Sequence, residues 1–150
     1  MTKTKKKQTE IKVRLVITDF ECHPSELTRI LHLEPTVMWL RGDSIPKTTM
    51  TRKQNGWRLD SPSMLRGTLQ EQVDALLDKV APQVGFFHHL PSGSEIELAC
   101  VVYVYDAEPV LGLSAKSVTE LARLGASIDI DYYDLRNDSG KPKATSANLD

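Results

Sequence analysis

The sequence predicts a single α+β domain in which about three helices pack on one face of a mainly antiparallel sheet. Three observations support this fold class: strand-like alternation, three amphipathic helical stretches, and two strand–helix–strand passages joined by an extra helix. Paired passages of this kind indicate a ferredoxin-like tendency. We expect the domain over residues 10–136. Residues 1–9 and 137–150 are expected to form a basic N-terminal and a C-terminal disordered tail, because they are too polar to build a core.

The first passage begins with EIKVRLVITDF, where apolar residues at every second position predict a half-buried strand. Leu27, Ile30 and Leu31 then fall at helical spacing and predict a short amphipathic helix, which Pro35 ends. The segments TVMWLR and GWRLDS are interpreted as extended pieces separated by a loop of about a dozen residues. Asn55-Gly56 predicts a tight turn between them.

The joining helix is predicted over TLQEQVDALLDKVAPQV. Thr68 and Glu71 have the spacing of a capping box, and Pro82 should close the helix. The second passage begins with EIELACVVYVYD, which is apolar on both faces and therefore predicts an interior strand.

The second passage continues with a helix for which Ser114 suits the N-cap and Gly125 the left-handed position after the C-terminus. Its expected buried stripe is Val118, Leu121 and Ala122. ASIDIDYY then predicts a strand with one wet face.

Composition places the chain among ordinary soluble proteins of the cytoplasm. Of 150 residues, 40% are hydrophobic and 26% charged, and the two cysteines cannot form a disulfide framework. The basic N-terminus lacks the apolar segment of a signal peptide, and no apolar run could span a membrane. Residues 1–68 carry 13 Lys/Arg and 7 Asp/Glu, whereas the rest of the chain is acidic, an asymmetry that favours either a charged partner or contact between the two halves.

The long loop between the two tryptophans is the first candidate binding site. Basic side chains on a long connection can bind phosphate or carboxylate, and tryptophan can stack on a base. The alternative is an ordinary connection, in which Trp57 is a core residue. The candidate binding residues are Trp39, Arg41, Lys47, Arg52, Lys53 and Arg58.

Other polar clusters give weaker indications. Asp129, Asp131 and Asp134 form a candidate acidic patch for a basic partner, or the solvated face of a strand; their spacing does not fit a calcium loop. Cys22-His23 and His88-His89 are adjacent pairs whose side chains diverge if the local backbone is extended, so we expect no metal site and no cofactor. The tripeptide RGD at residues 41–43 is interpreted as a chance occurrence. There is no nucleophile elbow, so no catalytic residue is named.

Several segments together resemble the bacterial domain-of-unknown-function family 4279. The resemblance rests on PSELTRILHLEPT with Leu31 and Pro35, on Gly56-Trp57, and on LARLGASIDIDYY at 121–133. Leu33 follows His32 where the family often has glycine before an apolar residue, and this departure leaves the turn at the helix exit open. The resemblance covers most of residues 13–133. It implies a single α+β domain and supplies no catalytic residues.

These observations favour a small non-catalytic binding protein, such as an immunity-type or regulatory protein that masks a protein partner. The first alternative is nucleic-acid or nucleotide binding through the basic loop at 41–58, helped by the N-terminal lysines. The second alternative is an unrecognised enzyme, which would need a deep pocket lined by groups of perturbed pKa. A homodimer is left open, and no membrane partner is expected.

Overall fold

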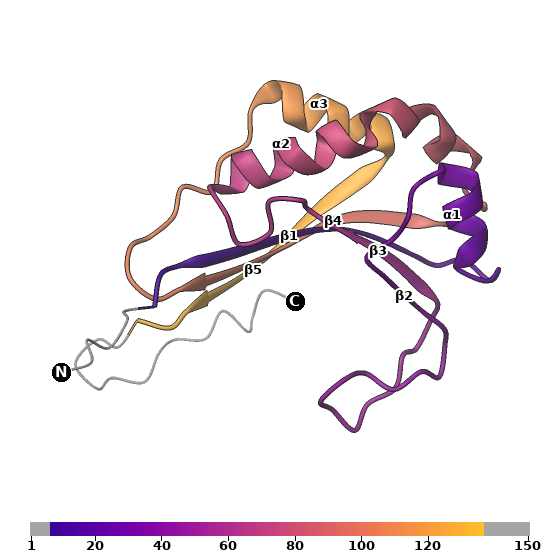
Figure 1. The fold of residues 1–150 in the computed structure, drawn as a ribbon, viewed down its shortest axis with the longest axis horizontal. Coiled ribbons are helices and arrows are strands. Elements are labelled where there is room, and N and C mark those ends of the chain that lie inside the picture. Colours follow the sequence, from indigo (N-terminus) through magenta and orange to yellow (C-terminus); the bar gives the residue numbers. More distant parts are fainter. Residues whose placement is uncertain (1–6, 137–150) are drawn as a thin grey trace.

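Strand β1, Glu10–Thr18, lies in the middle of a five-stranded sheet with the order β2-β3-β1-β4-β5 (Figure 1). The structure is a computed structural model that describes residues 7–136. The other elements are, in chain order, α1 (Ser25–Leu31), β2 (Val37–Trp39), β3 (Gly56–Asp60), α2 (Leu69–Val80), the 3₁₀ helix η1 (Ala81–His89), β4 (Glu95–Val104), α3 (Ala115–Leu124) and β5 (Ala126–Asp134).

The alternation predicted for the first strand is confirmed in β1. The side chains of Ile11, Val13, Leu15 and Ile17 are at most 5% exposed, whereas the residues between them are partly exposed. A β-strand directs successive side chains to opposite faces, so one face of β1 belongs to the core and the other does not.

The first four strands have the order and directions of a ferredoxin-like sheet. β1 pairs antiparallel with both β3 and β4, and β2 pairs antiparallel with β3. Two interlocked strand–helix–strand units result: β3 lies between the parallel strands of β1-α1-β2, and β1 lies between those of β3-α2-β4. The predicted α+β class and mainly antiparallel sheet are confirmed.

Strand β5 extends this four-stranded arrangement. It pairs with β4 in parallel, and α3 makes the connection between the two strands. The two passages recognised in the sequence therefore differ in space: the first has a strand inserted between its two strands, and the second joins direct neighbours. The strand predicted to be interior, β4, is paired on both sides.

The helices lie on one face of the sheet and enclose the core with it (Figure 1). Trp57 is fully buried there, as its strand position predicts, and its indole Nε1 donates a hydrogen bond to Thr28 Oγ1 in α1 at 3.1 Å. Buried Gln72 of α2 donates through Nε2 to the carbonyl oxygen of Ile11 at 2.7 Å. These two bonds tie the helix layer to the sheet as well as satisfying buried donors.

Helix α2 begins as predicted, with the capping box formed. The side chain of Thr68 accepts from the Glu71 backbone N–H, and the Glu71 carboxylate accepts from the Thr68 N–H. The α-helix ends at Val80, but the chain continues as η1, which the sequence did not predict. Pro82 lies in the first turn of η1. Backbone N–H groups in the first turn of a helix have no acceptor within that helix, so the lack of an N–H in proline costs no hydrogen bond there.

The buried stripe predicted for α3 is partly wrong. Val118 is 48% exposed and Ala122 is exposed, whereas Ser117, Leu121 and Leu124 are buried. The buried face of α3 is rotated about the helix axis from the predicted one and includes the polar residue Ser117. Ser117 can face the neighbouring helix because its hydroxyl donates to Asp74 in α2 at 3.0 Å. The predicted N-cap at Ser114 and the left-handed Gly125 are confirmed.

Strand β5 is more exposed than its predicted alternation implied. Ile128 is 43% exposed although it lies on the same face as the core residues of β4. The physical reason is position, because a strand at the edge of a sheet is covered by a neighbour on one side only.

The predicted tails fall largely on residues 1–6 and 137–150, which lie outside the described residues. Thr9, placed in the N-terminal tail, donates through Oγ1 to Asp106 at 2.7 Å. Within the described residues, no helix is both long and apolar enough to cross a membrane.

Candidate functional site

One face of the sheet carries no helix in the part of the chain that the structure describes (Figure 1). We call it the open face. Its side chains are those that alternate with the buried residues of each strand, and the strand registers bring them into rows. The open face includes Glu10, Lys12, Arg14, Val16, Thr18, Val37, Trp39, Arg58, Asp60, Glu95, Glu97, Ala99, Val101, Tyr103, Ser127, Asp129, Asp131 and Tyr133.

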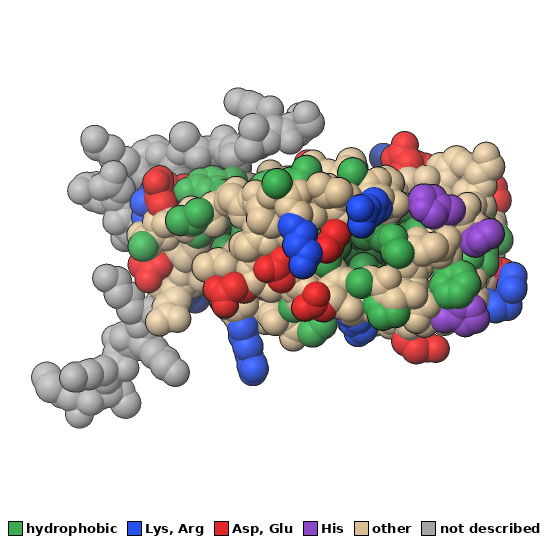
Figure 2. Space-filling view, turned by 90° about the horizontal axis from the view of Figure 1, so that it is seen from above, with side chains coloured by type: hydrophobic (Ala, Val, Ile, Leu, Met, Phe, Trp, Pro, Cys, Tyr) green, Lys and Arg blue, Asp and Glu red, His purple; other side chains and the backbone are tan. Residues whose placement is uncertain are grey.

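Charge on the open face is divided by strand. The cations Lys12, Arg14 and Arg58 come from β1 and β3, which also carry the acids Glu10 and Asp60. The charged residues that β4 and β5 contribute are all carboxylates: Glu95, Glu97, Asp129 and Asp131. The charge asymmetry of the sequence therefore survives in part as a basic middle and an acidic edge. The helix side differs, because Figure 2 shows acidic and basic side chains interspersed over it.

Arg14 stands at the centre of the basic part. Its strand neighbours are Asp60 on β3 and Ala99 on β4. Its Nε is shielded from water and has no hydrogen-bond partner among the described residues. Arg58, in contrast, is paired with Asp60, with Nε and Oδ1 2.8 Å apart and both side chains 22% exposed. Arg14 is thus a partly desolvated cation that retains unused hydrogen-bonding capacity.

Aromatic side chains border the open face beside the basic centre. The rings of Tyr103 and Tyr133 stack with centroids 5.5 Å apart, and the Lys12 Nζ lies 5.6 Å from the centre of the Tyr103 ring. Tyr133 is 41% exposed. Tyrosine offers a broad apolar surface together with a hydroxyl group, the combination that is enriched at protein interfaces.

The predicted acidic patch is divided by the sheet. Asp129 and Asp131 point to the open face, near Glu97 of β4, whereas Asp134 lies on the other side of β5 and pairs with Arg136 at 2.6 Å. Burial, followed by repulsion from Asp129 and Asp131, raises the pKa of Glu97. These three carboxylates therefore affect one another electrostatically.

The predicted long loop is an ordered hairpin. Backbone hydrogen bonds join Gly42 to Arg52 and Ile45 to Met50, and Ser44 and Thr51 form a β-bridge. The RGD tripeptide has a structural role here, because the Asp43 carboxylate accepts from the Leu40 N–H at 2.8 Å. We call residues 40–55 the hairpin; it projects beyond the β2 end of the sheet (Figure 1).

Trp39 is held at the base of the hairpin between two other residues. Its indole covers Gly56, where any side chain would overlap it, and the Arg52 guanidinium lies over its ring at 4.1 Å from the centroid. Both contacts hold the indole in place, although Trp39 remains partly exposed. Two of the predicted binding residues, Trp39 and Arg52, are used to bind each other.

The predicted tight turn at Asn55-Gly56 is wrong. Gly56 is the first residue of β3, and it is glycine because Trp39 leaves no room for a Cβ. Asn55 is a connector: its side-chain oxygen accepts from the Arg41 N–H at 2.8 Å, and its amide donates to the Cys22 carbonyl at 3.1 Å. Asparagine and glycine are common in turns, but here each residue is required by a tertiary contact.

Of the predicted binding residues, Trp39, Arg52 and Lys53 line one cleft beside the hairpin, and Arg41, Lys47 and Arg58 are not part of its lining. Arg41 approaches Glu21 at 3.4 Å with both side chains well exposed, and Lys47 and Lys53 are exposed with no ion pair among the described residues. A cleft of about 240 Å³ lies between the hairpin and the sheet, lined by Thr18, Trp39, Ile45, Met50 and neighbouring residues. The hairpin thus forms one wall of the open face rather than a separate basic lobe.

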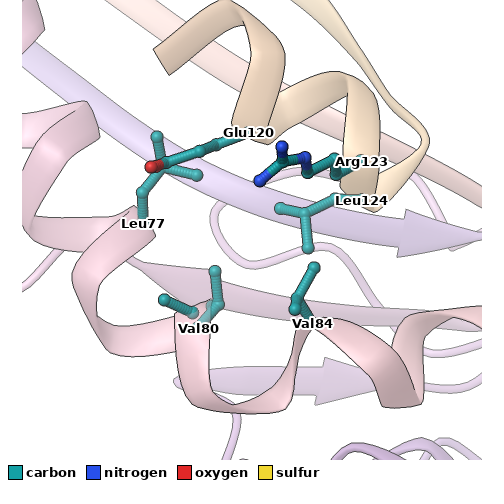
Figure 3. A pocket seen from close by; sticks show the side chains of 7 residues that line it. Leu77, Val80, Val84, Glu120, Arg123 and Leu124 are labelled. Atoms are coloured by element: carbon teal, nitrogen blue, oxygen red, sulfur yellow. The ribbon is translucent and has the colours of Figure 1, made fainter. Parts of the chain in front are cut away.

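A second pocket lies in the helix layer, away from the open face. It has a volume of about 170 Å³, and its lining is mainly apolar, from Leu77 and Val80 of α2, Val84 of η1 and Leu124 of α3. Figure 3 shows Glu120 and Arg123 of α3 beside these apolar side chains. An apolar pocket with opposite charges beside it offers no catalytic arrangement.

Asp106 combines a pocket with a perturbed pKa. It lines a hollow of about 400 Å³ near the N-terminal end of β1. A hydrogen bond from the Thr9 hydroxyl, with further bonds from the backbone of Ala107 and Thr9, lowers the pKa of Asp106. Its oxygens therefore organise this turn.

Histidine side chains gather at the end of the molecule formed by α1 and η1 (Figure 2). His32 packs against Phe86 with ring centroids 4.7 Å apart. Across residues 7–136, no group of three or more His, Cys, Asp or Glu side chains is placed to hold a metal ion.

Sequence reasoning missed the centre of the open face, above all Arg14 and Tyr103. The alternation of residues along the first strand already indicated this face. Lysine and arginine at every second position show that one side of the strand is not buried in the core. What the sequence did not show is that β1 and β4 are neighbours, which alone brings these side chains together.

The fold and the open face define an α+β domain with a ferredoxin-like core and one sheet face that no helix of residues 7–136 covers. The chain belongs to the family described as domain of unknown function (DUF4279), whose model matches residues 9–135. No curated protein and no solved structure matches the chain significantly.

Proposed function

We propose that this chain is a non-catalytic binding protein, of an immunity or regulatory type, that masks a protein partner with the open face of its sheet. The observation that carries the proposal is the open face itself: a half-exposed sheet surface with cations, carboxylates and tyrosines in ordered rows. Antiparallel sheets tolerate one face in water, so exposure alone would not suffice. The cations, carboxylates and tyrosines on this face provide the further support.

Arg14 is the expected anchor of the contact. Leaving a partly desolvated guanidinium with an unbonded Nε is unfavourable, and a carboxylate or carbonyl oxygen from a partner would offset that cost. Arginine and tyrosine are also the residue types most often responsible for binding energy at protein interfaces. Arg14 and Tyr133 therefore fit the centre and the border of one contact surface.

The hairpin supports the same surface from the side. Its backbone bridges and the Trp39–Arg52 contact hold it in a defined position, so little ordering entropy would be lost on binding. Exposed Met50, 59% accessible, would then meet the partner as part of the wall beside the cleft.

Nucleic-acid binding through residues 41–58 is the competing proposal, and exposed Lys47 and Lys53 favour it. Two findings weigh against it. The Trp39 indole already packs against Gly56 and the Arg52 guanidinium, which a stacking base would have to displace, and the carboxylates of β5 would repel a phosphate backbone passing over the open face. A gel-shift experiment at low salt separates the two proposals, because nucleic-acid binding predicts retardation that salt abolishes.

We place the proposed function in the cytoplasm, where a reducing environment keeps thiols such as Cys22 and Cys100 free. The decisive experiment is an affinity capture from the native host with three versions of the chain. These are the wild type, the open-face variant Lys12→Glu/Arg14→Glu, and the helix-side control Lys79→Glu/Arg123→Glu, which changes charge equally.

We expect a stoichiometric protein partner with the wild type and the control, and its loss with the open-face variant. Circular dichroism should show all three chains folded. If no stoichiometric partner appears, or if the helix-side control alone loses it, the proposal is wrong. Masking is tested separately, by adding the purified chain to the captured partner and measuring the partner's own activity.

A further inference from the structure

The pocket in the helix layer has the size and lining of a site for one small apolar group. Its cavity of about 170 Å³ lies among the aliphatic side chains of Leu77, Val80, Ala81, Val84 and Leu124. Figure 3 shows Val80, Val84 and Leu124 pointing toward one another. A cavity of about 150 Å³ with an aliphatic lining can hold a molecule as large as benzene. The pocket therefore accommodates a branched chain of about four carbons and is too small for a lipid tail.

Two opposite charges of α3 stand beside this apolar lining. Glu120 and Arg123 are three residues apart, and this spacing sets two Cβ atoms about 5–6 Å apart on one side of a helix. Figure 3 shows both side chains extending from α3 along the pocket. Within residues 7–136, neither side chain forms a hydrogen bond or an ion pair. Both charges are therefore available to a ligand.

The same spacing of charges has a different outcome on α1. Glu26 and Arg29 are also three residues apart, and Arg29 Nη2 lies 2.8 Å from Glu26 Oε2. Glu120 and Arg123 do not pair in this way and remain separate beside a cavity. A ligand with one positive and one negative group would give each of them a partner.

We propose that this pocket binds a free α-amino acid with a branched aliphatic side chain, of the leucine type. The side chain of the ligand fills the cavity, its ammonium group donates to the Glu120 carboxylate, and its carboxylate accepts from the Arg123 guanidinium. The inference goes beyond the proposed function and uses another site, because the helix layer and the open face lie on opposite sides of the sheet (Figure 1).

The three features of the pocket together select this class of ligand. A carboxylic acid without an amine leaves Glu120 unpaired and brings a like charge close to it, and an aliphatic amine does the same to Arg123. Alanine carries both charges but leaves the apolar lining without contacts. An internal segment of a peptide has neither terminal charge. Only an amino acid with an aliphatic side chain satisfies the lining and both charges.

Isothermal titration calorimetry of the full chain with L-leucine tests the inference. We expect saturable binding with a dissociation constant of about 1 mM or lower. Isocaproate has the same side chain without the ammonium group, and isoamylamine has it without the carboxylate. Each should bind about tenfold more weakly, because a hydrogen bond between charged groups is lost. L-alanine is three carbons shorter and should bind about 50-fold more weakly.

Matched variants test whether the binding occurs at this pocket. Glu120→Gln and Arg123→Gln should each weaken the binding of L-leucine about tenfold, and Ala81→Leu should abolish it by filling the cavity. The control Glu26→Gln/Arg29→Gln removes two charges of the same spacing from α1 and should bind L-leucine like the wild type. Circular dichroism should show every chain folded.

A cycle of variants and ligands identifies which charge each side chain meets. Arg123→Gln should bind L-leucine and isoamylamine with equal affinity, because the carboxylate of leucine has lost its partner. Glu120→Gln should likewise bind L-leucine and isocaproate equally. The inference is overturned if L-leucine does not saturate the chain, if these pairs still differ as they do in the wild type, or if folded Ala81→Leu keeps full affinity. It is also overturned if sedimentation shows a dimer that Ala81→Leu dissociates, since a second copy then covers the pocket.

This inference and the proposed function can fail separately. The helix-side control of the capture experiment, Lys79→Glu/Arg123→Glu, should lose L-leucine while it keeps the host partner. The open-face variant Lys12→Glu/Arg14→Glu should lose the partner while it keeps L-leucine. If L-leucine binds but capture yields no stoichiometric partner, the amino-acid site stands while the proposed function does not.

Discussion

The indole of Trp39 lies against Gly56, the residue opposite it in the β2–β3 pair. The Arg52 guanidinium also lies over the ring, 4.1 Å from its centroid, so the base of the hairpin joins backbone, indole and guanidinium. This contact fixes where the hairpin leaves the sheet. It also explains why a glycine stands at the start of a strand, where glycine is otherwise unfavourable.

Gly56→Ala should therefore destabilise the fold. The new methyl group overlaps the indole, and overpacking of this kind typically costs about 1–3 kcal/mol. Urea unfolding followed by circular dichroism measures the change. Gly85→Ala is the control, because a Cβ at that position meets nothing within 4 Å, and it should lie within about 0.5 kcal/mol of the wild type. Equal stability of the two variants would show that Trp39 does not depend on Gly56.

The capping box of α2 gives a second prediction. Thr68→Ala removes the acceptor for the Glu71 N–H and should cost about 1 kcal/mol of unfolding free energy. Because the two side chains act on each other's backbone, the double variant Thr68→Ala/Glu71→Ala should cost less than the sum of the single changes. Thermal unfolding of all four chains measures this coupling, and strict additivity would argue that the box does not act as a unit.

Glu97 gives a prediction about pH. Its pKa is raised in the folded chain, first by burial and then by Asp129 and Asp131, so folding favours the protonated carboxyl. The stability associated with this group is present below its ordinary pKa and is lost as the pH rises through the raised value. Glu97→Gln should therefore stabilise the chain at about pH 7 and give no gain at about pH 3.5, below the usual glutamate pKa.

Urea unfolding at both pH values checks this difference. The control Glu34→Gln, which removes one negative charge from an exposed site, should show no comparable gain at neutral pH. A stabilisation by Glu97→Gln that is the same at both pH values would mean that ionisation of Glu97 is not its source.

The reactivity of the two cysteines tests whether Cys100 is buried in the core. Burial, with repulsion from Asp129 and Glu97, raises the pKa of Cys100 to about 12, so its thiol is protonated and covered at pH 8. Cys22 is partly exposed. Iodoacetamide at about pH 8 should alkylate Cys22 in the native chain and Cys100 only after unfolding in guanidinium, because the thiolate is the reactive form. Mass spectrometry of a Cys22→Ser variant gives the check: native labelling of that variant would contradict the buried position of Cys100.

Much of the fold could be predicted from periodicity, because burial of one face leaves a repeat of two or about 3.6 in the sequence. The strand β1, the helix α2 with its capping box, and the family resemblance all follow from local patterns of this kind. The predictions were wrong where a contact with a distant part of the chain determines the local structure. Asn55-Gly56 has the composition of a turn, but Gly56 packs against Trp39 and Asn55 donates to the Cys22 carbonyl. Ser117 of α3 is buried because Asp74 of α2 accepts its hydrogen bond.

The candidate site was less predictable than the fold, for the same reason. The basic residues of the long loop stand out in the sequence, yet the structure uses Trp39 and Arg52 to hold the hairpin. Arg14, in contrast, is unremarkable in the sequence, since lysine and arginine often lie on the wet face of a strand. It becomes a candidate only when the sheet order shows that its neighbours are Asp60 and Ala99 on an uncovered surface.

The central claim is that the open face contacts the partner, and covalent footprinting of lysines tests it most directly. The chain is acetylated with and without the captured partner, and the modification of Lys12 on the open face is compared with that of Lys79 on the helix side. The account predicts strong protection of Lys12 and none of Lys79. Protection of Lys79 with Lys12 still fully reactive would contradict it.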